Sequence, residues 1–407
     1  MRIAVVHPYP VSSRSVGGTT RVYALVRYFA ARHEVHVFAH SHGQPAAEQE
    51  AVRELASLGV TQRVFPRPPS SWLTKARWAL SSAPYFVGHN RNPALESALV
   101  TLDRERGLDV AHLELIALEP LLHGLGPQCA RVLAEQELMS ITIERLRTVP
   151  FRHKMPYQHY ITRQIPRIRR FEAEALRRFD RLFGIHEGEA TRMAALSGRK
   201  VEVLPHVVDT RTFTPGPARP GLQSVLFVGN YRHHPNVDAV FWLMERVWPA
   251  VQRGAPETVV RLVGPGLEPA QARALEALGA EVTGRVEDLV GAYRTATVFA
   301  NSIQSGGGMR GKVLEAFACG IPVVSTALGL EGIAAEPGEH CERADDAEGF
   351  ATALLRLLGN SSLRCARAQC ARTLVVKHYD VRVVMEQLEV AFEEARDARR
   401  ERAGKWA

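Results

Sequence analysis

The sequence lacks several features that would place it in a specialised class of protein. It has no apolar run of the roughly 18 residues that a membrane-spanning helix needs. The first residues, Met1-Arg2 and a short apolar run that ends before Pro8, do not have the form of a signal peptide. Its five cysteines are scattered and include no Cys-x-x-Cys pair. We therefore expect reduced thiols in a cytoplasmic protein, with neither disulfides nor a zinc site.

Three common motifs for phosphate or metal binding are also incomplete. The absence of any Asp-x-Asp argues against a carboxylate-held metal that bridges a diphosphate, so we expect no metal and no cofactor. The loops at 17–19 and 264–266 both lack the third glycine of the dinucleotide fingerprint, which argues against nicotinamide chemistry. Gly306 and Gly311-Lys312 have P-loop spacing, but Val313 stands where a hydroxyl residue would hold Mg²⁺. We therefore reject a P-loop NTPase.

What the sequence does contain is a regular alternation of apolar runs and helical patterns. Its 407 residues are enough for two domains. The expected strands are residues 2–7, 34–39, 63–65, 109–113, 131–134 and 181–185 in the first half, then 224–228, 258–263, 281–283, 297–301 and 322–325. The expected helices include residues 22–29, 93–106, 238–251, 270–277, 287–296, 312–319, 347–358, 363–374 and 381–402. This alternation predicts an α/β protein with two doubly wound parallel sheets facing a cleft, and the turn-rich residues 215–220 are expected to link them.

Positive charge is concentrated in one segment. The net charge is +8, and residues 142–183 alone hold eleven Arg or Lys and four acidic residues, which gives +7. One interpretation is a solvated helix whose arginine stems cover apolar surface. The other is contact with an anionic membrane face or an acidic acceptor. Nucleic acid is not expected as a partner, because no recognition module accompanies the segment.

The most informative motif is a glycine run that meets a helix after the strand at 297–301. Gly306, Gly307 and Gly308 allow successive backbone N–H groups to surround an anion, and the following helix adds its positive end. Arg310 and Lys312 stand at that helix start, where cations are disfavoured unless a polyanion is bound. We therefore expect a diphosphate site. The alternative is that Lys312 pairs with Glu315 and that Arg310 is solvated.

Two further loops follow strands. Residues 229–236 are polar and cationic, and we expect Arg232 to contact a phosphate, with a solvated turn as the alternative. His233 and His234 lack a third ligand at suitable spacing for a metal. The third loop, Gly17-Gly18, is weak evidence for a ligand-binding loop when it is taken alone.

Together these motifs resemble the GT-B glycosyltransferases, specifically family four of retaining, nucleotide-sugar-dependent enzymes. The resemblance covers most of the chain and is strongest at 225–333, in GNYRHHPN (229–236), TGRV (283–286), SGGGMRGKVLEAFACG (305–320) and PVVST (322–326). It also includes Gly17-Gly18 and LPHVVD at 204–209. It implies an acceptor domain at 1–205, a donor domain at 206–380, and a helix at 381–407 that crosses back to the N-terminal domain.

The resemblance also implies roles for individual residues. Arg310 and Lys312 are the expected catalytic pair, which would stabilise the leaving diphosphate of a UDP-type or GDP-type sugar. Glu315 would accept from the ribose hydroxyls, and the backbone of 284–286 would border the base. The expected donor-binding residues are Gly17, Gly18, Gly229, Arg232, Gly284, Arg285, Val286, Gly306, Gly307, Gly308, Met309, Val313 and Glu315. The acceptor would be a glycan, a lipid-linked sugar or a small molecule.

This chain departs from the family pattern at two positions. Gly307 stands where a first glutamate is usual, and Glu135-Gln136-Glu137 stands where a histidine often follows the strand at 131–134. Gln136 and His112 are candidate contacts for the sugar or acceptor, although His112 also fits a structural histidine. Because of these departures, two alternatives to a transferase stay open: a non-catalytic nucleotide-sugar-binding partner, and a sugar-nucleotide epimerase of the same fold.

Overall fold

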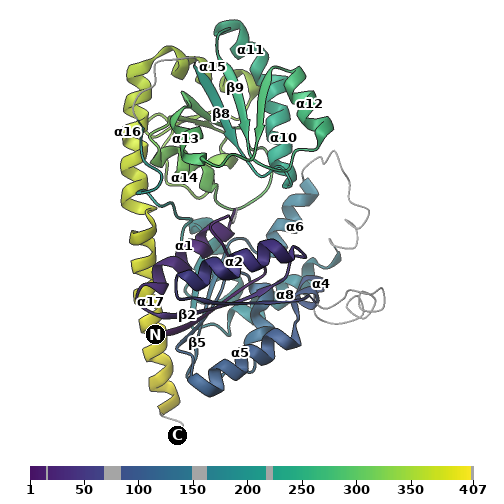
Figure 1. The fold of residues 1–407 in the computed structure, drawn as a ribbon, viewed down its shortest axis with the longest axis vertical. Helices are drawn as coiled ribbons and strands as arrows, with labels where there is room; N and C mark the ends of the chain where they lie inside the picture. The colour runs from purple at the N-terminus through teal and green to yellow at the C-terminus, as the bar shows by residue number, and fades with distance from the viewer. Residues whose placement is uncertain (15–16, 68–83, 149–162, 217–222, 405–407) are drawn as a thin grey trace. The chain divides into compact units, whose positions relative to one another are not determined.

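The structure is a computed structural model that describes residues 1–407 except 15–16, 68–83, 149–162, 217–222 and 405–407. It divides into two units. Unit 1 consists of Met1–Pro205 with Val384–Ala407, and unit 2 consists of His206–Val383. Each unit is a parallel sheet with helices packed on it (Figure 1).

The unit 1 sheet has seven parallel strands in the order β3-β2-β1-β4-β5-β6-β7. They are β1 Arg2–His7, β2 Glu34–His40, β3 Thr61–Phe65, β4 Val110–Leu113, β5 Ala130–Glu135, β6 Arg181–Gly184 and β7 Glu202–Val203. The helical elements are α1 Thr19–Ala30, α2 Pro45–Ser57, α4 Tyr85–Asn90, α5 Pro93–Arg106, η1 Ile116–Leu122, α6 Met139–Thr148, α8 Ile165–Leu176, α9 Glu187–Ser197 and α17 Val381–Gly404. β1 is apolar and almost wholly buried because helices cover both faces of a parallel sheet.

The unit 2 sheet has six parallel strands in the order β10-β9-β8-β11-β12-β13. They are β8 Ser224–Val228, β9 Val259–Val263, β10 Ala280–Gly284, β11 Val298–Asn301, β12 Val323–Ser325 and β13 Glu342–Arg343. The helical elements are α10 His234–Trp242, η2 Leu243–Val247, α11 Trp248–Gly254, α12 Pro269–Ala277, α13 Leu289–Arg294, α14 Gly311–Ala318, η3 Leu328–Leu330, α15 Ala347–Gly359 and α16 Ser361–His378. Two parallel α/β sheets confirm the predicted fold class.

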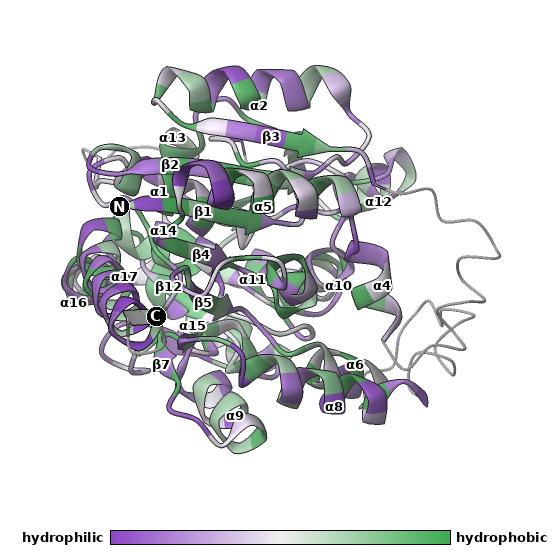
Figure 2. Cartoon of the chain, turned by 90° about the horizontal axis from the view of Figure 1, so that it is seen from below, coloured by the Kyte–Doolittle hydropathy of each residue, from purple (hydrophilic) through white to green (hydrophobic). Residues whose placement is uncertain are grey.

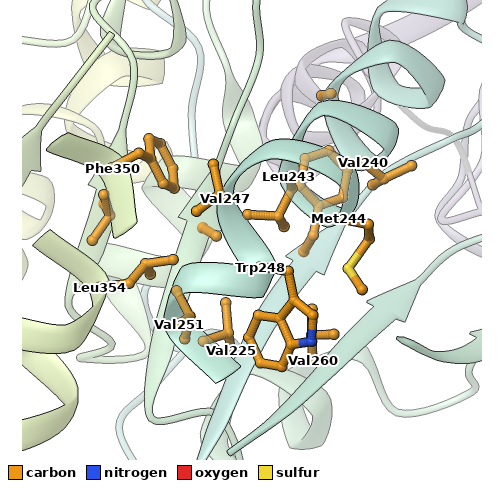
Figure 3. Packing of buried hydrophobic residues seen from close by; sticks show 14 of the residues in the cluster. Val225, Val240, Leu243, Met244, Val247, Trp248, Val251, Val260, Phe350 and Leu354 are labelled. Carbon is orange, nitrogen blue, oxygen red and sulfur yellow. The ribbon is translucent and has the colours of Figure 1, made fainter. Parts of the chain in front are cut away.

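The core of unit 2 is built around Trp248. Its indole lies against Val225 and Val260 of the sheet, and Phe350 and Leu354 of α15 complete the cluster (Figure 3). Every one of these side chains is at most 2% exposed, so this cluster fixes α11 and α15 on the sheet. The site described below lies at the carboxyl ends of the same strands.

Two expectations need correction. The helix expected at 238–251 begins earlier, at His234, and is interrupted by the π-helical turn η2. Pro249 in α11 cannot donate a backbone hydrogen bond to the turn before it, which explains the wider turn. The expected linker at 215–220 is also wrong in its described part. Pro215 and Gly216 lie in unit 2, packed against Gly320 and Arg294, and the unit boundary follows Pro205. Residues 217–220 lie outside the described residues.

Helix α2 was not predicted from the sequence. Only Ala51 and Leu55 are buried in it, so its apolar stripe is narrow, and polar and apolar residues alternate along it (Figure 2). In contrast, α1 buries Val22, Leu25, Val26 and Phe29, the apolar residues that predicted it.

Candidate nucleotide-sugar site

Three glycine-containing loops join at the carboxyl edge of the unit 2 sheet. Gly229 N donates to Val263 O at 2.9 Å, and Gly264 N donates to Gly284 O at 2.8 Å. A Cβ on Gly264 would lie 1.8 Å from Gly229 O, and its φ of +133° also favours glycine. The predicted residues Gly229 and Gly284 are therefore brought to one edge of the sheet. Gly264 was noted in the sequence only as part of a failed fingerprint, and it is the residue that allows this close packing.

The glycine run after β11 forms an open loop before α14. Gly306 and Gly308 have φ values of +90° and +78°. Among the residues that the structure describes, the N–H groups of Gly306, Gly307 and Gly308 donate to no acceptor. Arg310 donates to the carbonyls of all three glycines, with Nη2 at 3.1 Å from Gly306 O. The loop is thus fixed by its carbonyls while its N–H groups are available to an anion.

Lys312 is held beside this loop by contacts from other elements. Its Nζ donates to Asn236 Oδ1 at 2.7 Å and lies 4.2 Å from the centre of the Phe227 ring. Burial, together with the charge of Arg310, lowers the pKa of Lys312 to about 7. An anionic ligand would stabilise the charged form of this buried amine.

Glu315 has a partner of its own. Tyr293 Oη donates to Glu315 Oε2 at 2.8 Å, and burial raises the pKa of Glu315. The alternative in which Lys312 merely pairs with Glu315 is therefore not what the structure shows. Sequence reasoning gave no role to Tyr293 or Asn236. Tyr293 belongs to no motif, and Asn236, although it ends the motif at 229–236, meets Lys312 only in the folded chain.

The loop after β8 adds further positive groups. The side chains of Arg232, His233 and His234 are exposed. Partial burial of its ring and the charges of Arg310 and Lys312 lower the pKa of His233. His233 therefore lies within electrostatic reach of both cations. No group of three His, Cys, Asp or Glu side chains in the described part of the chain is arranged to hold a metal.

Four other predicted donor-site residues differ in exposure. Met309 is buried, with Sδ accepting from His206 N at 3.2 Å, and Val313 is fully buried in the core. The side chains of these two residues are therefore closed to a ligand, and Val313 N already donates to Arg310 O. Arg285 is exposed and Val286 is half-buried.

In unit 1, the structure brings Gly18 and Gln136 together. Gly18 caps the N-terminus of α1, and a Cβ there would lie 2.0 Å from Gln136 Oε1. Gly17 has a φ of +61°, and a Cβ added to it would have no atom within 4 Å. The side-chain amide of Gln136 therefore packs directly against Gly18 of the predicted glycine loop, at the carboxyl edge of the unit 1 sheet.

The other candidates of unit 1 are buried. His112 is 0% exposed, and its Nε2 lies 3.0 Å from Glu114 Oε1, which supports the structural interpretation of this histidine. Glu135, next to Gln136, accepts from Ile116 N at 2.6 Å. Burial raises the pKa of Glu135 well above its ordinary value, and the charge of Glu172 adds to this effect.

Cations of the basic segment are mostly paired where the structure describes them. Residues 149–162 lie outside the described part. The pairs are Arg145–Glu137, Arg169–Glu144, Arg170–Glu174, Arg178–Glu119 and Arg181–Glu202. This pairing supports the interpretation of a solvated helix, and contact with an anionic membrane stays a prediction. Within the described residues, every helix is too short or too polar to cross a bilayer.

Comparison with known proteins places the glycine loop inside a matched domain. Residues 223–360 match the family described as Glycosyl transferases group 1. An uncharacterized 44.6 kDa protein in the cps region of Klebsiella pneumoniae is 26% identical over 173 residues. That match covers 40% of this chain and 45% of the relative, so the chain spans about half the length of that curated protein.

Solved structures resemble almost the whole chain. HepE of Anabaena in complex with UDP has a TM-score of 0.69 at 14% identity and covers 97% of this chain and 100% of that one. Sucrose-phosphate synthase of Thermosynechococcus elongatus has a TM-score of 0.71 at 15% identity, with 98% and 100% covered. At these identities the likeness shows the fold. The chain therefore has the GT-B fold, and residues 223–360 of its second unit are similar to the group 1 glycosyl transferases.

Proposed function

We propose that the chain transfers a hexose from a nucleoside-diphosphate sugar to an acceptor, with retention of configuration. The observation that carries this proposal is the loop Gly306–Gly308 with its available N–H groups, next to Lys312 at the start of α14. The loop lies within the matched glycosyl transferase region. HepE of Anabaena, which shares the fold, has been solved with UDP and with UDP-glucose, which favours a UDP-type donor here.

In the proposed reaction, the bond between the anomeric carbon and the diphosphate oxygen breaks. The acceptor hydroxyl oxygen bonds to that carbon, and its proton goes to the leaving phosphate. Arg310 and Lys312 stabilise the negative charge that develops on the diphosphate, which is typically worth several kcal/mol in a site with fixed charges. Under this proposal Glu315 accepts from the ribose hydroxyls after it exchanges its hydrogen bond with Tyr293. Under this proposal the two cations take the place that a metal has in other transferases.

The first experiment measures nucleotide binding by calorimetry. UDP and GDP are titrated into the wild-type chain and into Lys312→Ala. We expect a loss of affinity of at least tenfold in the variant, because the buried cation next to the diphosphate is gone. The matched control is Lys377→Ala, an exposed lysine of α16, which should bind as the wild type does. Equal affinity in Lys312→Ala would refute the diphosphate site.

The second experiment separates transfer from the two alternatives. A panel of sugar nucleotides is incubated with candidate acceptors, and release of UDP or GDP is measured. Release that depends on acceptor supports a transferase. Binding without release for every acceptor would favour a non-catalytic partner, and interconversion of the donor sugar without acceptor would favour an epimerase.

A further inference from the structure

A cavity of about 470 Å³ opens in unit 1. It is lined by residues that follow three neighbouring strands, with Tyr9 after β1, Ser41 to Gly43 after β2 and Arg67 after β3. His89 of α4 completes the wall. The carboxyl edge of a parallel sheet is where open α/β folds bind their ligands. The cavity therefore lies at the ligand-binding edge of the sheet, on the β1–β3 side of the switch point between β1 and β4.

Arg67 is fixed in this wall by neutral groups. Its Nη1 donates to Asn90 Oδ1 at 3.2 Å, and its Nη2 donates to Pro8 O at 2.8 Å. Its guanidinium also lies 5.7 Å from the centre of the Tyr9 ring. Because an amide, a carbonyl and an aromatic ring carry no net charge, these contacts position the guanidinium without neutralising it. A guanidinium held in this way is suited to phosphate or carboxylate.

The positive charge of the cavity wall comes from Arg67. Burial and the charges of Arg67 and His89 lower the pKa of His40, behind the wall, to about 4, so His40 is neutral at pH 7. His42 Nδ1 lies 2.7 Å from Glu48 Oε1, which also accepts from Ser41 Oγ. These hydrogen bonds outweigh burial and lower the pKa of Glu48 to about 2, so Glu48 stays ionised, but it does not line the cavity. The described residues that line the cavity include no carboxylate. An anion entering the cavity thus meets positive charge without competition from an acidic lining group.

Tyr9 presents an aromatic surface beside that charge. It is 50% exposed, which is unusual for a large apolar side chain in this protein. Its backbone carbonyl lies 2.8 Å from His7 Nδ1, which fixes the turn that carries it. An exposed, anchored aromatic ring offers a flat apolar face with a polar tip, and the C–H face of a sugar ring is complementary to such a surface.

We propose that this cavity is the acceptor subsite and that it takes a sugar carrying a phosphate or a carboxylate. Arg67 binds the anionic group, and Tyr9 packs against the sugar ring. The inference rests on the proposed function, because a transferase needs an acceptor site besides its nucleotide site. It extends that function by naming the acceptor as an anionic sugar.

The test is a set of calorimetric titrations of the full chain with glucose 1-phosphate, glucuronate, glucose and inorganic phosphate. UDP or GDP is present at saturation so that the glycine loop is filled. We expect either or both anionic sugars to bind at least tenfold more tightly than glucose and than inorganic phosphate. The first two titrations distinguish a phosphate from a carboxylate. Equal binding of the anionic sugars and glucose would overturn the charge argument, and equal binding of inorganic phosphate would overturn the sugar argument.

Variants assign the binding to this cavity. Arg67→Gln should lose the preference for anionic sugars by at least tenfold, whereas Arg67→Lys keeps the charge and should retain part of it. Tyr9→Ala should weaken all three sugars by a similar factor. The matched control is Arg53→Gln, an exposed arginine of α2 outside the cavity, which should bind as the wild type does. Unchanged preference in Arg67→Gln, with the melting temperature preserved, would overturn the proposal.

Failure of this inference can be told apart from failure of the proposed function. Normal nucleotide binding without any Arg67-dependent sugar binding would remove the acceptor subsite and leave the transferase proposal intact. Absence of UDP and GDP binding would count against the transferase. In that case the sugar titrations are repeated without nucleotide, and their dependence on Arg67 decides whether the cavity binds an anionic sugar.

Discussion

At Gly264, a single hydrogen in place of a side chain decides how closely two loops approach. A Cβ at this position would meet Gly229 O at 1.8 Å, which is backbone that cannot rotate away. Gly284 also has a positive φ, +64°, but nothing lies within 4 Å of a Cβ there. An alanine at Gly284 therefore meets the conformational cost alone, whereas an alanine at Gly264 meets a steric clash in addition to the strain of its φ of +133°.

We expect Gly284→Ala to lower the free energy of unfolding by about 1–2 kcal/mol, the usual cost of a left-handed alanine. Gly264→Ala should lower it by clearly more, because the loops after β8 and β9 must also move apart. Denaturant unfolding of both variants measures the difference. Equal losses would mean that the loops adjust freely and that their packing does not fix the site.

Glu172 on α8 is a buried carboxyl whose protonation is coupled to folding. Ser140 Oγ donates to its Oε2 at 2.6 Å, and Ser140 N donates to its Oε1 at 3.1 Å. Burial raises the pKa of Glu172 to about 7 from an ordinary value of 4.5. Between these values the folded chain binds more protons than the unfolded chain, so stability falls as pH rises from about 4.5 to about 7.

Glu172→Gln should therefore be more stable than the wild type at pH 8, by at most about 3 kcal/mol, with the advantage disappearing near pH 4.5. Glutamine keeps an acceptor for Ser140 N and can donate to Ser140 Oγ. Melting temperatures of both chains from pH 5 to pH 8 measure this. Glu174→Gln, an exposed change on the same helix, is the control and should show no such trend. An advantage that grows toward low pH would contradict the assignment.

At the residue scale, the sequence predicted groups that act through a local motif. The glycine run with Arg310 and Lys312 is visible because its members are adjacent in the chain. Tyr293 and Asn236 could not be found in this way, since their partners Glu315 and Lys312 are brought to them only by folding. Arg67 and Tyr9 were missed for the same reason, because their cavity joins the ends of three strands.

Among the elements, α14 combines two unfavourable features in its first turn. A helix N-terminus carries partial positive charge, and Lys312 places a buried amine there. The pKa of Lys312 is lowered to about 7 without ligand, from an ordinary value of 10.5. A diphosphate at this position would favour the charged amine and raise that pKa again. Binding should therefore be linked to proton uptake.

We expect UDP or GDP binding to take up close to one proton at pH 8 and almost none at pH 6, where Lys312 is already charged. Affinity should accordingly fall as pH rises above about 7. Calorimetry in buffers of different ionisation enthalpy measures the uptake. Lys312→Met should abolish it, and Lys377→Met should leave it unchanged. Proton release, or uptake that persists in Lys312→Met, would show that another group titrates.

Elements with strong periodicity were predicted from the sequence, and elements without it were not. The longer strands of both sheets were predicted from their apolar runs, and α1 was predicted because its apolar residues recur at the helical period. The two-residue strand β7 was not predicted. β13 has two residues, too few for any pattern, and α2 buries only two side chains. The π-helical turn before Pro249 was missed because the apolar pattern continues through it, and only backbone hydrogen bonding distinguishes it.

In the whole molecule, unit 1 is built from both ends of the chain. Residues of α17 complete its core, where Phe392 stacks on Phe29 of α1 with ring centres 5.1 Å apart. Met385 and Leu388 are also fully buried, and His33 Nε2 lies 2.7 Å from Glu389 Oε1. The helix is therefore an integral part of unit 1, although all of unit 2 precedes it in the sequence.

Phe392→Ala should lower the free energy of unfolding of unit 1 by about 3–5 kcal/mol, the usual cost of removing a buried phenyl ring. Val390→Ala on the same helix should change it by less than about 0.5 kcal/mol, since Val390 is 53% exposed. Hydrogen exchange of amides in β1 and α1 measures the stability of unit 1. Equal exchange rates in the two variants would mean that α17 contributes little to that core.

The position of α17 also sets an order of events during synthesis. The residues of β1 and α1 are translated before all of unit 2, and the phenyl ring that covers Phe29 is translated after it. Until then the nascent N-terminal half carries an uncovered apolar face, open to chaperones and proteases. A chain whose translation stops before α17 would keep that face exposed.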